Sequence, residues 1–361
     1  MKICVIYASA GAGHMKAAEA VYESLKTNPA HQVVFIDALS QTTSFFKRLY
    51  CGGYFLIISR FPWLWRLVFE FLDQPFLQPL FRPLRRFYNA VNMAGLHRYF
   101  IREKFDYIIS THFMPNEIVS ALKRSGKISS RLLAIVTDYD VHHIWLGSGV
   151  DSYAVATEWT KDKLACMGVE AAKIHVTGIP INEKFTQRPD IIELKERLGL
   201  PQDQFTVLIA TGSFGIGPIE QLISKLNDLQ LVVVCGHGKA LYSRLSTLNI
   251  PSVKVMGLVN NMHELMAVSD VMVTKPGGLS IAEALASQLP MIFFSAIPGQ
   301  ETNNIKVLKG YEIGISDCSL DQIAAELLRL KNSRDIFLTA IKRTQKIARP
   351  YAVRDVLNLI R

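Results

Sequence analysis

The feature that most constrains this chain is an alternation of short β-branched runs with longer helical stretches. Before Arg188 the runs span 2–7, 32–36, 107–110, 132–136, 153–156 and 173–176, with helical stretches at 15–26, 116–123 and 159–167 among them. After Arg188 the runs resume at 206–210, 231–235, 253–256, 271–274, 291–294 and 313–315. Continuous apolar strands separated by helices indicate parallel sheets covered on both faces. The sequence therefore predicts an α/β protein.

Because the alternation of strands and helices resumes after Arg188, the sequence predicts two doubly wound, Rossmann-like domains. A chain of 361 residues is long enough for two domains, and Gly178, Pro180 and Pro189 mark a linker. We expect domains at 1–184 and 185–361, with the last helix able to pack back on the first domain. Ligands of open parallel sheets bind beyond the carboxyl ends of the strands, so two such sheets are expected to face each other across a cleft.

Charge and aromatic residues are concentrated in one segment, 45–104. The whole chain has a net charge of +9, of which this segment carries +7, together with 16 of the 35 aromatic residues. The segment follows the second strand and is too long for an ordinary connection, so it is expected to form helices of its own. An apolar content of 49% excludes wholesale disorder, and the basic excess indicates a negatively charged partner.

The cysteines indicate the redox compartment of the chain, and its hydropathy indicates whether it can cross a membrane. The five cysteines are widely spaced and show no metal-ligand or disulfide pattern, which is typical of a reducing cytosol. The longest apolar stretch, 55–72, is interrupted by Arg60, Pro62, Arg66 and Glu70. The sequence thus predicts a soluble or peripheral protein.

The loop after the first strand, 8–14, contains Gly11 and Gly13. Two glycines let the backbone turn tightly and let a ligand approach its amides. A dinucleotide fingerprint fails because Lys16 stands where the third glycine is required, and no P-loop is present, which disfavours NAD and ATP enzymes. His14 ends the loop at a helix N-terminus, where the dipole keeps an imidazole neutral. It can therefore act as a general base, or it can merely line the turn.

Polar or glycine-rich loops follow four predicted strands of the second half. The run 275–278 opens a helix, so its free backbone N–H groups suit a diphosphate, and Glu283 can accept hydrogen bonds from ribose hydroxyls or be an ordinary solvated residue. A Pro-Gly turn at 298–299 precedes side chains that suit sugar hydroxyls. The predicted donor-site residues are Gly212, Ser213, Gly236, Lys275, Pro276, Gly277, Gly278, Glu283, Gln300, Glu301 and Asn304.

Several motifs, in their order and spacing, resemble those of the diacylglycerol glycosyltransferases. They are Gly11-Ala12-Gly13-His14, Val136-Thr137-Asp138 with His142 and Trp145, Gly178-Ile179-Pro180-Ile181, Thr274–Gly278 with Glu283, and Pro298-Gly299-Gln300-Glu301. That family includes bacterial processive diacylglycerol β-glucosyltransferases and plant-type monogalactosyldiacylglycerol synthases. A more distant resemblance is to the N-acetylglucosaminyltransferase that makes the lipid-linked disaccharide of peptidoglycan. The likeness covers nearly the whole chain and is least detailed in the segment 45–104.

The resemblance implies a GT-B fold whose second half holds a UDP-sugar. It places Gly277 and Gly278 at the diphosphate, Glu283 at the ribose, and Val259 at the uracil edge. Gln300 and Glu301 would meet the sugar. His14 would be the base that activates the acceptor hydroxyl, which gives inversion at the anomeric carbon.

Asp138 and Asp140 form a D-x-D triplet, a metal–nucleotide signature of a different glycosyltransferase fold. In the family that this chain resembles, helix dipoles and amides stabilise the diphosphate, so neither a metal nor another cofactor is expected. Asp138, with His142 and Trp145, is expected to line the acceptor side or to orient His14. A buried Asp that caps a turn is the alternative.

The segment 45–104 is expected to dock on a membrane next to a lipid acceptor. Trp favours the headgroup level and Arg meets lipid phosphates, although part of these side chains can form a helical core instead. The predicted acceptor and membrane residues are Gly11, Gly13, His142, Trp145, Trp63, Trp65, Arg66, Arg82, Arg85 and Arg86. The expected partners are a UDP-sugar, diacylglycerol and anionic lipids, at the cytoplasmic face of the cell membrane.

Glucose transfer is favoured over galactose because the stretches 136–145 and 274–278 look nearer to the bacterial glucosyl enzymes. Galactosyl transfer, or N-acetylglucosaminyl transfer to a polyprenyl-linked acceptor, are the alternatives. A nucleic-acid-binding protein is the competing class, but the basic excess is local and no RNA-binding signature is present. A UDP-sugar epimerase of similar fold would not explain the segment 45–104.

Overall fold

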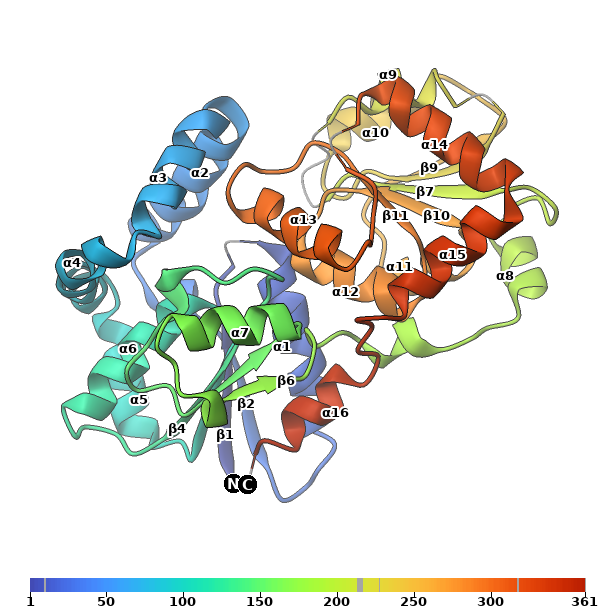
Figure 1. Ribbon diagram of the computed structural model, residues 1–361. Coiled ribbons are helices and arrows are strands. Elements are labelled where there is room, and N and C mark those ends of the chain that lie inside the picture. The colour runs from blue at the N-terminus through green and yellow to red at the C-terminus, as the bar shows by residue number, and fades with distance from the viewer. Residues whose placement is uncertain (10, 213–216, 227, 317, 361) are drawn as a thin grey trace. The chain divides into compact units, whose positions relative to one another are not determined.

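A computed structural model describes residues 1–9, 11–212, 217–226, 228–316 and 318–360, which form two compact units (Figure 1). Unit 1 comprises Met1–Asn182, Ile297–Asn304 and Tyr351–Arg361, and unit 2 comprises Glu183–Ala296 and Ile305–Pro350. The sequence predicts a boundary after residue 184, and the structure places it after Asn182. It also assigns to unit 1 a short segment, Ile297–Asn304, that we expected in the second domain.

Unit 1 is built on a sheet of six parallel strands in the order β2-β1-β3-β4-β5-β6. Their bounds are β1 Lys2–Tyr7, β2 Gln32–Asp37, β3 Tyr107–Ser110, β4 Arg131–Ile135, β5 Ser152–Val155 and β6 Ile174–Val176. The helices of the wound part are α1 Ala12–Leu25, α6 Phe113–Arg124, α7 Glu158–Cys166 and α16 Ala352–Leu357. The strand order reverses between β1 and β3, which is where a ligand site is expected in such a sheet.

Both faces of this sheet are buried. Ile3, Val5 and Ile109 face one core cluster, and Cys4, Ile6 and Ile108 face the other. The C-terminal helix α16 contributes Val356 to the first cluster, next to Val21 of α1. Strands that are covered on both faces read as continuous apolar runs, which is why periodicity located them in the sequence.

The segment 45–104 forms helices of its own, as predicted. They are α2 Ser44–Arg60, α3 Pro62–Leu72, α4 Gln78–Asn92 and α5 Ala94–Glu103. Thr43 caps α2 by accepting a hydrogen bond from the Phe46 amide, and Pro62 occupies the first position of α3, where its missing N–H costs nothing.

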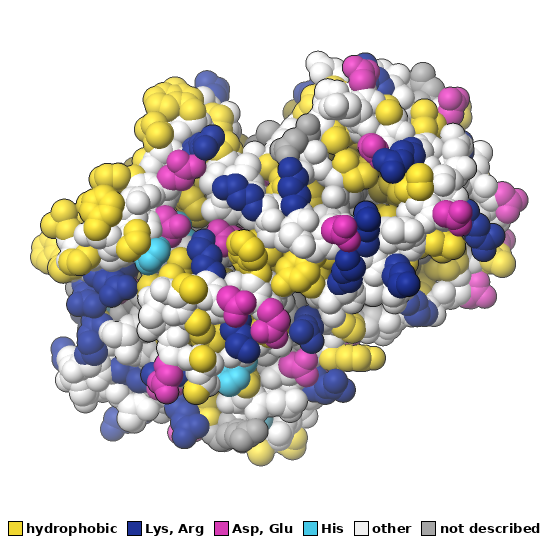
Figure 2. All heavy atoms as spheres, in the orientation of Figure 1, with side chains coloured by type: hydrophobic (Ala, Val, Ile, Leu, Met, Phe, Trp, Pro, Cys, Tyr) yellow, Lys and Arg dark blue, Asp and Glu magenta, His cyan; other side chains and the backbone are white. Residues whose placement is uncertain are grey.

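These helices expose an unusual amount of apolar surface. No residue of α3 is buried, and α2 buries only Phe46. Half of the 16 aromatic residues in the segment are exposed, and most of the others are partly buried. Figure 2 shows hydrophobic side chains gathered over α2, α3 and α4. We define the insert patch as the exposed side chains Phe45, Leu49, Phe55, Leu56, Phe61, Trp63, Leu64, Leu67, Val68, Phe71, Phe76, Leu80, Leu84, Phe87, Tyr88 and Val91.

Among the described residues, no helix combines the length and the apolar character that crossing a membrane requires.

Unit 2 is built on a sheet of five parallel strands in the order β11-β10-β7-β8-β9. Their bounds are β7 Thr206–Ala210, β8 Gln230–Val234, β9 Val253–Met256, β10 Val271–Thr274 and β11 Met291–Phe293. The predicted strand 313–315 is wrong, because only Ile315 pairs, in an isolated parallel bridge to Ile292. Gly314, with a φ of +75°, turns the chain there and prevents a regular strand.

The remaining helices surround this second sheet or connect to it. They are α8 Ile191–Arg197, α9 Ile219–Ile223, α10 Lys239–Ser246, α11 Met262–Ala267, α12 Gly278–Ala286, α13 Gln300–Gly310, α14 Leu320–Asn332 and α15 Arg334–Thr344. Short 3₁₀ helices lie at η1 Ala38–Gln41, η2 Pro75–Leu77, η3 His143–Trp145, η4 Ala171–Lys173 and η5 Glu183–Thr186.

Candidate active site

Polar residues follow each of four adjacent strands of unit 1. Asp37 ends β2, Ser9 follows β1, Thr111 follows β3, and Thr137 and Asp138 follow β4. Because the strands are parallel and adjacent, their carboxyl ends meet at one edge of the sheet. This edge brings together residues as far apart in the sequence as Ser9 and Asp138.

His14 lies at the centre of this edge, in the first turn of α1. Its Nδ1 is 2.7 Å from the carbonyl oxygen of Thr111 and 2.8 Å from the hydroxyl oxygen of Thr137. A carbonyl oxygen can only accept, so Nδ1 must carry the hydrogen and donate it to Thr111. The other ring nitrogen, Nε2, then holds a lone pair and can accept a proton.

The surroundings keep this imidazole neutral. Burial lowers the pKa of His14 below its usual value, against the opposing effects of Asp138 and of the hydrogen bond to Thr111. His112, whose ring centroid lies 4.8 Å from that of His14, is buried, and its pKa is lowered well below the usual value by burial and by His14. Its Nδ1 accepts the Met114 amide and thereby caps α6.

Asp138 is held by two amide side chains from the segment Ile297–Asn304. Gln300 Nε2 donates to one carboxylate oxygen at 3.0 Å, and Asn304 Nδ2 donates to the other at 3.1 Å. Asn304 is fully buried, and its own oxygen accepts the backbone N–H groups of Tyr139 and Asp140. Burial raises the pKa of Asp138, while His14 and these two hydrogen bonds oppose that rise.

We predicted Gln300, Glu301 and Asn304 as donor-site residues. The structure instead uses the Asn304 amide to hold the loop after β4, and it places Gln300 on Asp138. The carboxylate of Glu301 accepts the Ile297 amide at 2.6 Å. Contact of these three residues with a sugar stays a prediction.

At Gly11, in the loop after β1, one part of the prediction is wrong and the other agrees with the structure. Gly11 has a φ of 179°, an extended conformation open to any residue, so no tight turn requires glycine there. A Cβ at Gly11 would meet no described atom within 4 Å, which leaves room for a ligand. Ser9 is fixed because its N–H and its hydroxyl both donate to Asp37, which also pairs with Lys47 of α2 at 3.0 Å.

The loop after β4 is tied to helix α3 of the insert. His142 Nε2 donates to the carbonyl of Phe69 at 2.9 Å, and its Nδ1 accepts the Ile144 amide. His143 contacts Asp73 through both its backbone N–H and its ring. Trp145 is buried with its ring centroid 6.5 Å from that of His14. Trp145 thus lies beside the candidate base, whereas both ring nitrogens of His142 are engaged in fixing this loop.

The tryptophan and arginine side chains predicted to meet a membrane lie in different environments. Trp63 is exposed, as is Arg66, which pairs with Glu70 one turn along α3. Arg85 is partly buried and pairs with Glu117 of α6 at 3.1 Å. Arg82 and Arg86, on either side of it along α4, are also partly buried. Figure 2 shows basic side chains over α4 and α6, beside the hydrophobic ones.

In unit 2, the predicted donor-site loops follow the carboxyl ends of neighbouring strands. Gly212 follows β7, Gly236 follows β8, Val259 follows β9, and Lys275 and Pro276 follow β10. Ser213 lies outside the described residues. Since these strands are adjacent and parallel, the loops share one edge of the sheet.

Helix α12 begins at this edge. Gly277 occupies the N-cap position and no described side chain caps the helix there, so the backbone amides of its first turn remain available to an anion. Gly278, the first residue of the helix, is buried. Glu283 lies partly buried in the second turn of the same helix.

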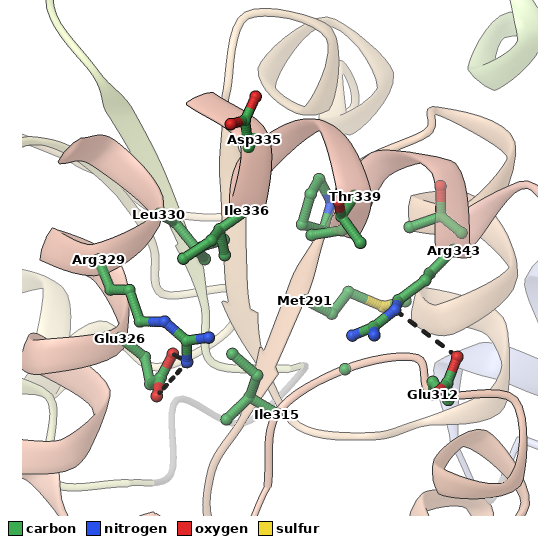
Figure 3. A pocket seen from close by; sticks show the side chains of 14 residues that line it. Met291, Glu312, Ile315, Glu326, Arg329, Leu330, Asp335, Ile336, Thr339 and Arg343 are labelled. Atoms are coloured by element: carbon green, nitrogen blue, oxygen red, sulfur yellow. Dashed lines mark hydrogen bonds and ion pairs between the residues drawn. The ribbon is translucent and has the colours of Figure 1, made fainter. Parts of the chain in front are cut away.

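A further cavity of about 340 Å³ lies elsewhere in unit 2, between α14, α15 and the start of β11 (Figure 3). Its apolar wall includes Met291 and Ile315, and its two arginines pair with Glu326 and Glu312. The cavity lies at the amino end of β11, opposite to the edge that binds ligands in such sheets. It contains none of the predicted site residues.

Three residues of the site were not predicted. Thr111 and Thr137 hold the His14 ring, and His112 packs against it. The signal available in the sequence was the polar pair 111–112 directly after the apolar strand 107–110.

The described part of the chain holds no group of three or more His, Cys, Asp or Glu side chains arranged to bind a metal ion. The absence of a metal requirement stays a prediction.

Two family models match the chain. That of monogalactosyldiacylglycerol synthase matches residues 14–181, and that of the glycosyltransferase family 28 C-terminal domain matches residues 206–349. A processive diacylglycerol β-glucosyltransferase of Staphylococcus epidermidis is 33% identical over 316 residues, which cover 84% of this chain and 78% of that protein. One of the same name from Bacillus cereus is 32% identical over 375 residues, covering 99% of this chain and 93% of that protein.

Solved structures share the fold at low identity. MurG of Acinetobacter baumannii has a TM-score of 0.62 at 14% identity, with 99% of each chain covered. Anabaena HepE in complex with UDP-glucose has a TM-score of 0.58 at 14% identity, covering all of this chain and 99% of that one. A putative UDP-N-acetylglucosamine 2-epimerase of Listeria monocytogenes has a TM-score of 0.62 at 12% identity, covering 99% of this chain and 95% of that one.

The fold alone therefore does not distinguish a transferase from an epimerase, since structures of both kinds share it. The sequence relatives do, because their identity to this chain extends over most of both proteins. The two sheets and the wound topology are those of GT-B glycosyltransferases. The chain belongs to the diacylglycerol glycosyltransferase family, the family of the processive diacylglycerol β-glucosyltransferases.

Proposed function

We propose that this protein transfers glucose from UDP-glucose to the free hydroxyl of diacylglycerol, with inversion at the anomeric carbon, at the cytoplasmic face of the membrane. The observation that carries the proposal is the His14 ring, whose hydrogen bond to Thr111 leaves Nε2 free to take a proton at the carboxyl edge of the sheet. The family relatives named as diacylglycerol β-glucosyltransferases support the acceptor and the sugar.

In this mechanism His14 is the general base. Nε2 takes the proton of the acceptor hydroxyl while the hydroxyl oxygen attacks the anomeric carbon, and the bond from that carbon to the β-phosphate oxygen breaks. A single displacement of this kind inverts the configuration. Asp138 stabilises the imidazolium as it forms, because its negative charge raises the pKa of His14.

We assign the nucleotide to unit 2. The amides at the start of α12 suit a diphosphate and stabilise the charge that develops on UDP as it leaves. Because these amides supply the electrostatic stabilisation, the proposed mechanism needs no metal. The structure of HepE with UDP-glucose is a precedent for a UDP-sugar on this fold.

The insert patch is the proposed membrane contact. Leaving one large apolar side chain exposed forgoes roughly 1.5–3 kcal/mol of burial, so exposed residues such as Leu67, Phe71 and Phe76 favour an apolar environment. Each basic residue beside them adds about 1 kcal/mol near an anionic surface. A two-tailed lipid leaves the bilayer only at great cost, so its enzyme must reach it there.

Galactosyl transfer is the second candidate. It is favoured by the match of residues 14–181 to monogalactosyldiacylglycerol synthase. Glucose and galactose differ in the configuration of one hydroxyl, which small shifts of side chains can distinguish.

The assignment is tested by incubating the purified protein with labelled UDP-glucose, UDP-galactose or UDP-N-acetylglucosamine and vesicles that carry either diacylglycerol or a polyprenyl-linked acceptor, with and without EDTA. We expect β-glucosyldiacylglycerol from UDP-glucose, formed at the same rate in EDTA. Transfer only to a polyprenyl-linked acceptor would overturn the proposal. Loss of activity in EDTA that added Mg²⁺ restores would overturn its metal-free mechanism.

His14→Ala removes the proposed base. We expect the turnover number to fall by about a hundredfold to ten-thousandfold, with UDP binding measured by calorimetry unchanged. His31→Ala, in the turn before β2, serves as the control and should retain full activity. Near-normal turnover by His14→Ala would show that another group takes the proton.

The pKa of His14 is predicted to lie below the usual 6.5, because burial outweighs the opposing charge of Asp138. Asp138→Asn removes a group that raises this pKa, so it should fall further. Asp140→Asn, whose carboxylate pairs with Lys163, should leave it unchanged. NMR titration of labelled histidine measures the pKa of His14 in the wild type and in both variants. The kcat/KM of the wild type should fall only as the pH drops through this lowered pKa. A pKa at or above 6.5 contradicts the assignment.

Membrane binding by the insert patch is tested by flotation with vesicles that contain anionic lipid. Wild-type protein should float, and Leu67→Asp with Phe71→Asp should reduce the bound fraction about tenfold. The matched control, Leu328→Asp with Leu338→Asp, changes exposed residues of α14 and α15 and should float normally. Binding to RNA at the same salt concentration, without binding to vesicles, would favour the nucleic-acid alternative.

A further inference from the structure

Helices α2 and α3 carry a row of aromatic rings that ends at His142, on the loop after β4. The ring centroids of Tyr54 and Trp65 are 5.1 Å apart, those of Trp65 and Phe69 are 5.9 Å apart, and those of Phe69 and His142 are 4.4 Å apart. We call Tyr54, Trp65 and Phe69 the aromatic strip. Trp65 and Phe69 are one turn apart and therefore share one face of α3.

The strip reaches the residues around Asp138. A Cβ placed on Gly299 would come within 2.8 Å of the Phe69 ring, so Phe69 packs directly on the turn before Gln300. Burial raises the pKa of Tyr54, and the charges of Glu301 and Asp138 raise it further. The strip thus extends from the surroundings of Asp138 to the insert.

The other sides of α3 are open. Trp63, Leu64, Leu67 and Phe71 are exposed members of the insert patch. One helix therefore carries both the surface proposed to enter the acyl boundary and a row of rings that leads inward. A lipid that enters along α3 would pass the strip before its hydroxyl reaches His14.

Trp65 carries an unsatisfied donor in this strip. Its indole Nε1 is shielded from solvent and has no hydrogen-bond partner among the described residues. An indole N–H can only donate, and buried donors are nearly always paired. No described acceptor, the Tyr54 hydroxyl included, lies within hydrogen-bond reach of this N–H, so a ligand that satisfies the donor must bring an acceptor of its own.

We propose that the indole N–H of Trp65 donates a hydrogen bond to an acyl-ester carbonyl of the acceptor lipid, and that the aromatic strip binds its glycerol backbone. This inference rests on the proposed function and specifies how the acceptor is recognised. An ester carbonyl is a neutral acceptor that diacylglycerol carries within a few bonds of its free hydroxyl. The apolar rings beside it suit the first methylenes of the acyl chains, and a phosphate would find no cation among them.

The test compares two acceptors that differ only in the carbonyl: a diacylglycerol with ester-linked chains and the dialkylglycerol with ether-linked chains of equal length. Both have the free hydroxyl, and both are presented in the same vesicles. For the wild-type protein, kcat/KM should be about tenfold higher for the ester lipid, because only it satisfies the buried donor. Trp65→Phe keeps an aromatic ring but lacks the N–H, so its ratio of ester to ether activity should fall to about one.

Trp63→Phe is the matched control, because it is the same substitution on the same helix at a side chain that is 62% exposed. Its ester-to-ether ratio should equal that of the wild type. The ratio is internal to each variant, so a folding or membrane-binding defect in Trp65→Phe lowers both activities and leaves the ratio unchanged.

Two results would overturn the inference while leaving the proposed function intact. One is equal use of ester and ether lipid by the wild type, and the other is an unchanged ratio in Trp65→Phe. Transfer to neither lipid would instead mean that the proposed function itself is wrong, and the inference would fail with it.

Discussion

The parallel pairing of β1 with β3, and of β3 with β4, determines where the candidate catalytic groups of this chain lie. These pairings bring the loops after residues 7, 110 and 135 to one edge of the sheet, where no local interaction would join them. The hydrogen bond from His14 to the carbonyl of Thr111 depends on that register. This hydrogen bond selects the tautomer of the His14 ring, and the tautomer decides which ring nitrogen can take a proton. The chemistry of the site is thus a consequence of sheet register.

The second constraint is the hydrogen bonding of Asp138. A partly buried carboxylate needs donors, and here Gln300 and Asn304 supply them from a segment more than 160 residues away in the sequence. Asn304 also holds the backbone of the loop after β4, so one buried amide fixes the position of that carboxylate. On the other side, His142 and His143 tie the same loop to α3. The insert that is proposed to contact the membrane therefore supports the loop next to the candidate base.

Much of the fold could be predicted from the sequence, because strands buried on both faces leave continuous apolar runs. The predicted strands 2–7, 107–110, 206–210, 253–256 and 271–274 coincide with β1, β3, β7, β9 and β10. The prediction at 313–315 is wrong because an apolar run cannot show that Gly314 adopts a positive φ. In the site, His14 and Asp138 stood out by type and position. Thr111 did not, because it acts through its backbone carbonyl, and every residue has one.

By itself, the sequence determined the fold class, the family and the concentration of charge and aromatic rings in one segment. Periodicity, motif order and composition are properties of the chain alone. Only the tertiary structure decided that Gln300 and Asn304 hold Asp138, that Arg85 pairs with Glu117, and that Trp65 turns inward while Trp63 stays exposed. The reason is physical: hydrogen bonds and burial depend on distances between residues far apart in the chain, and those distances exist only once the sheet and the insert have packed.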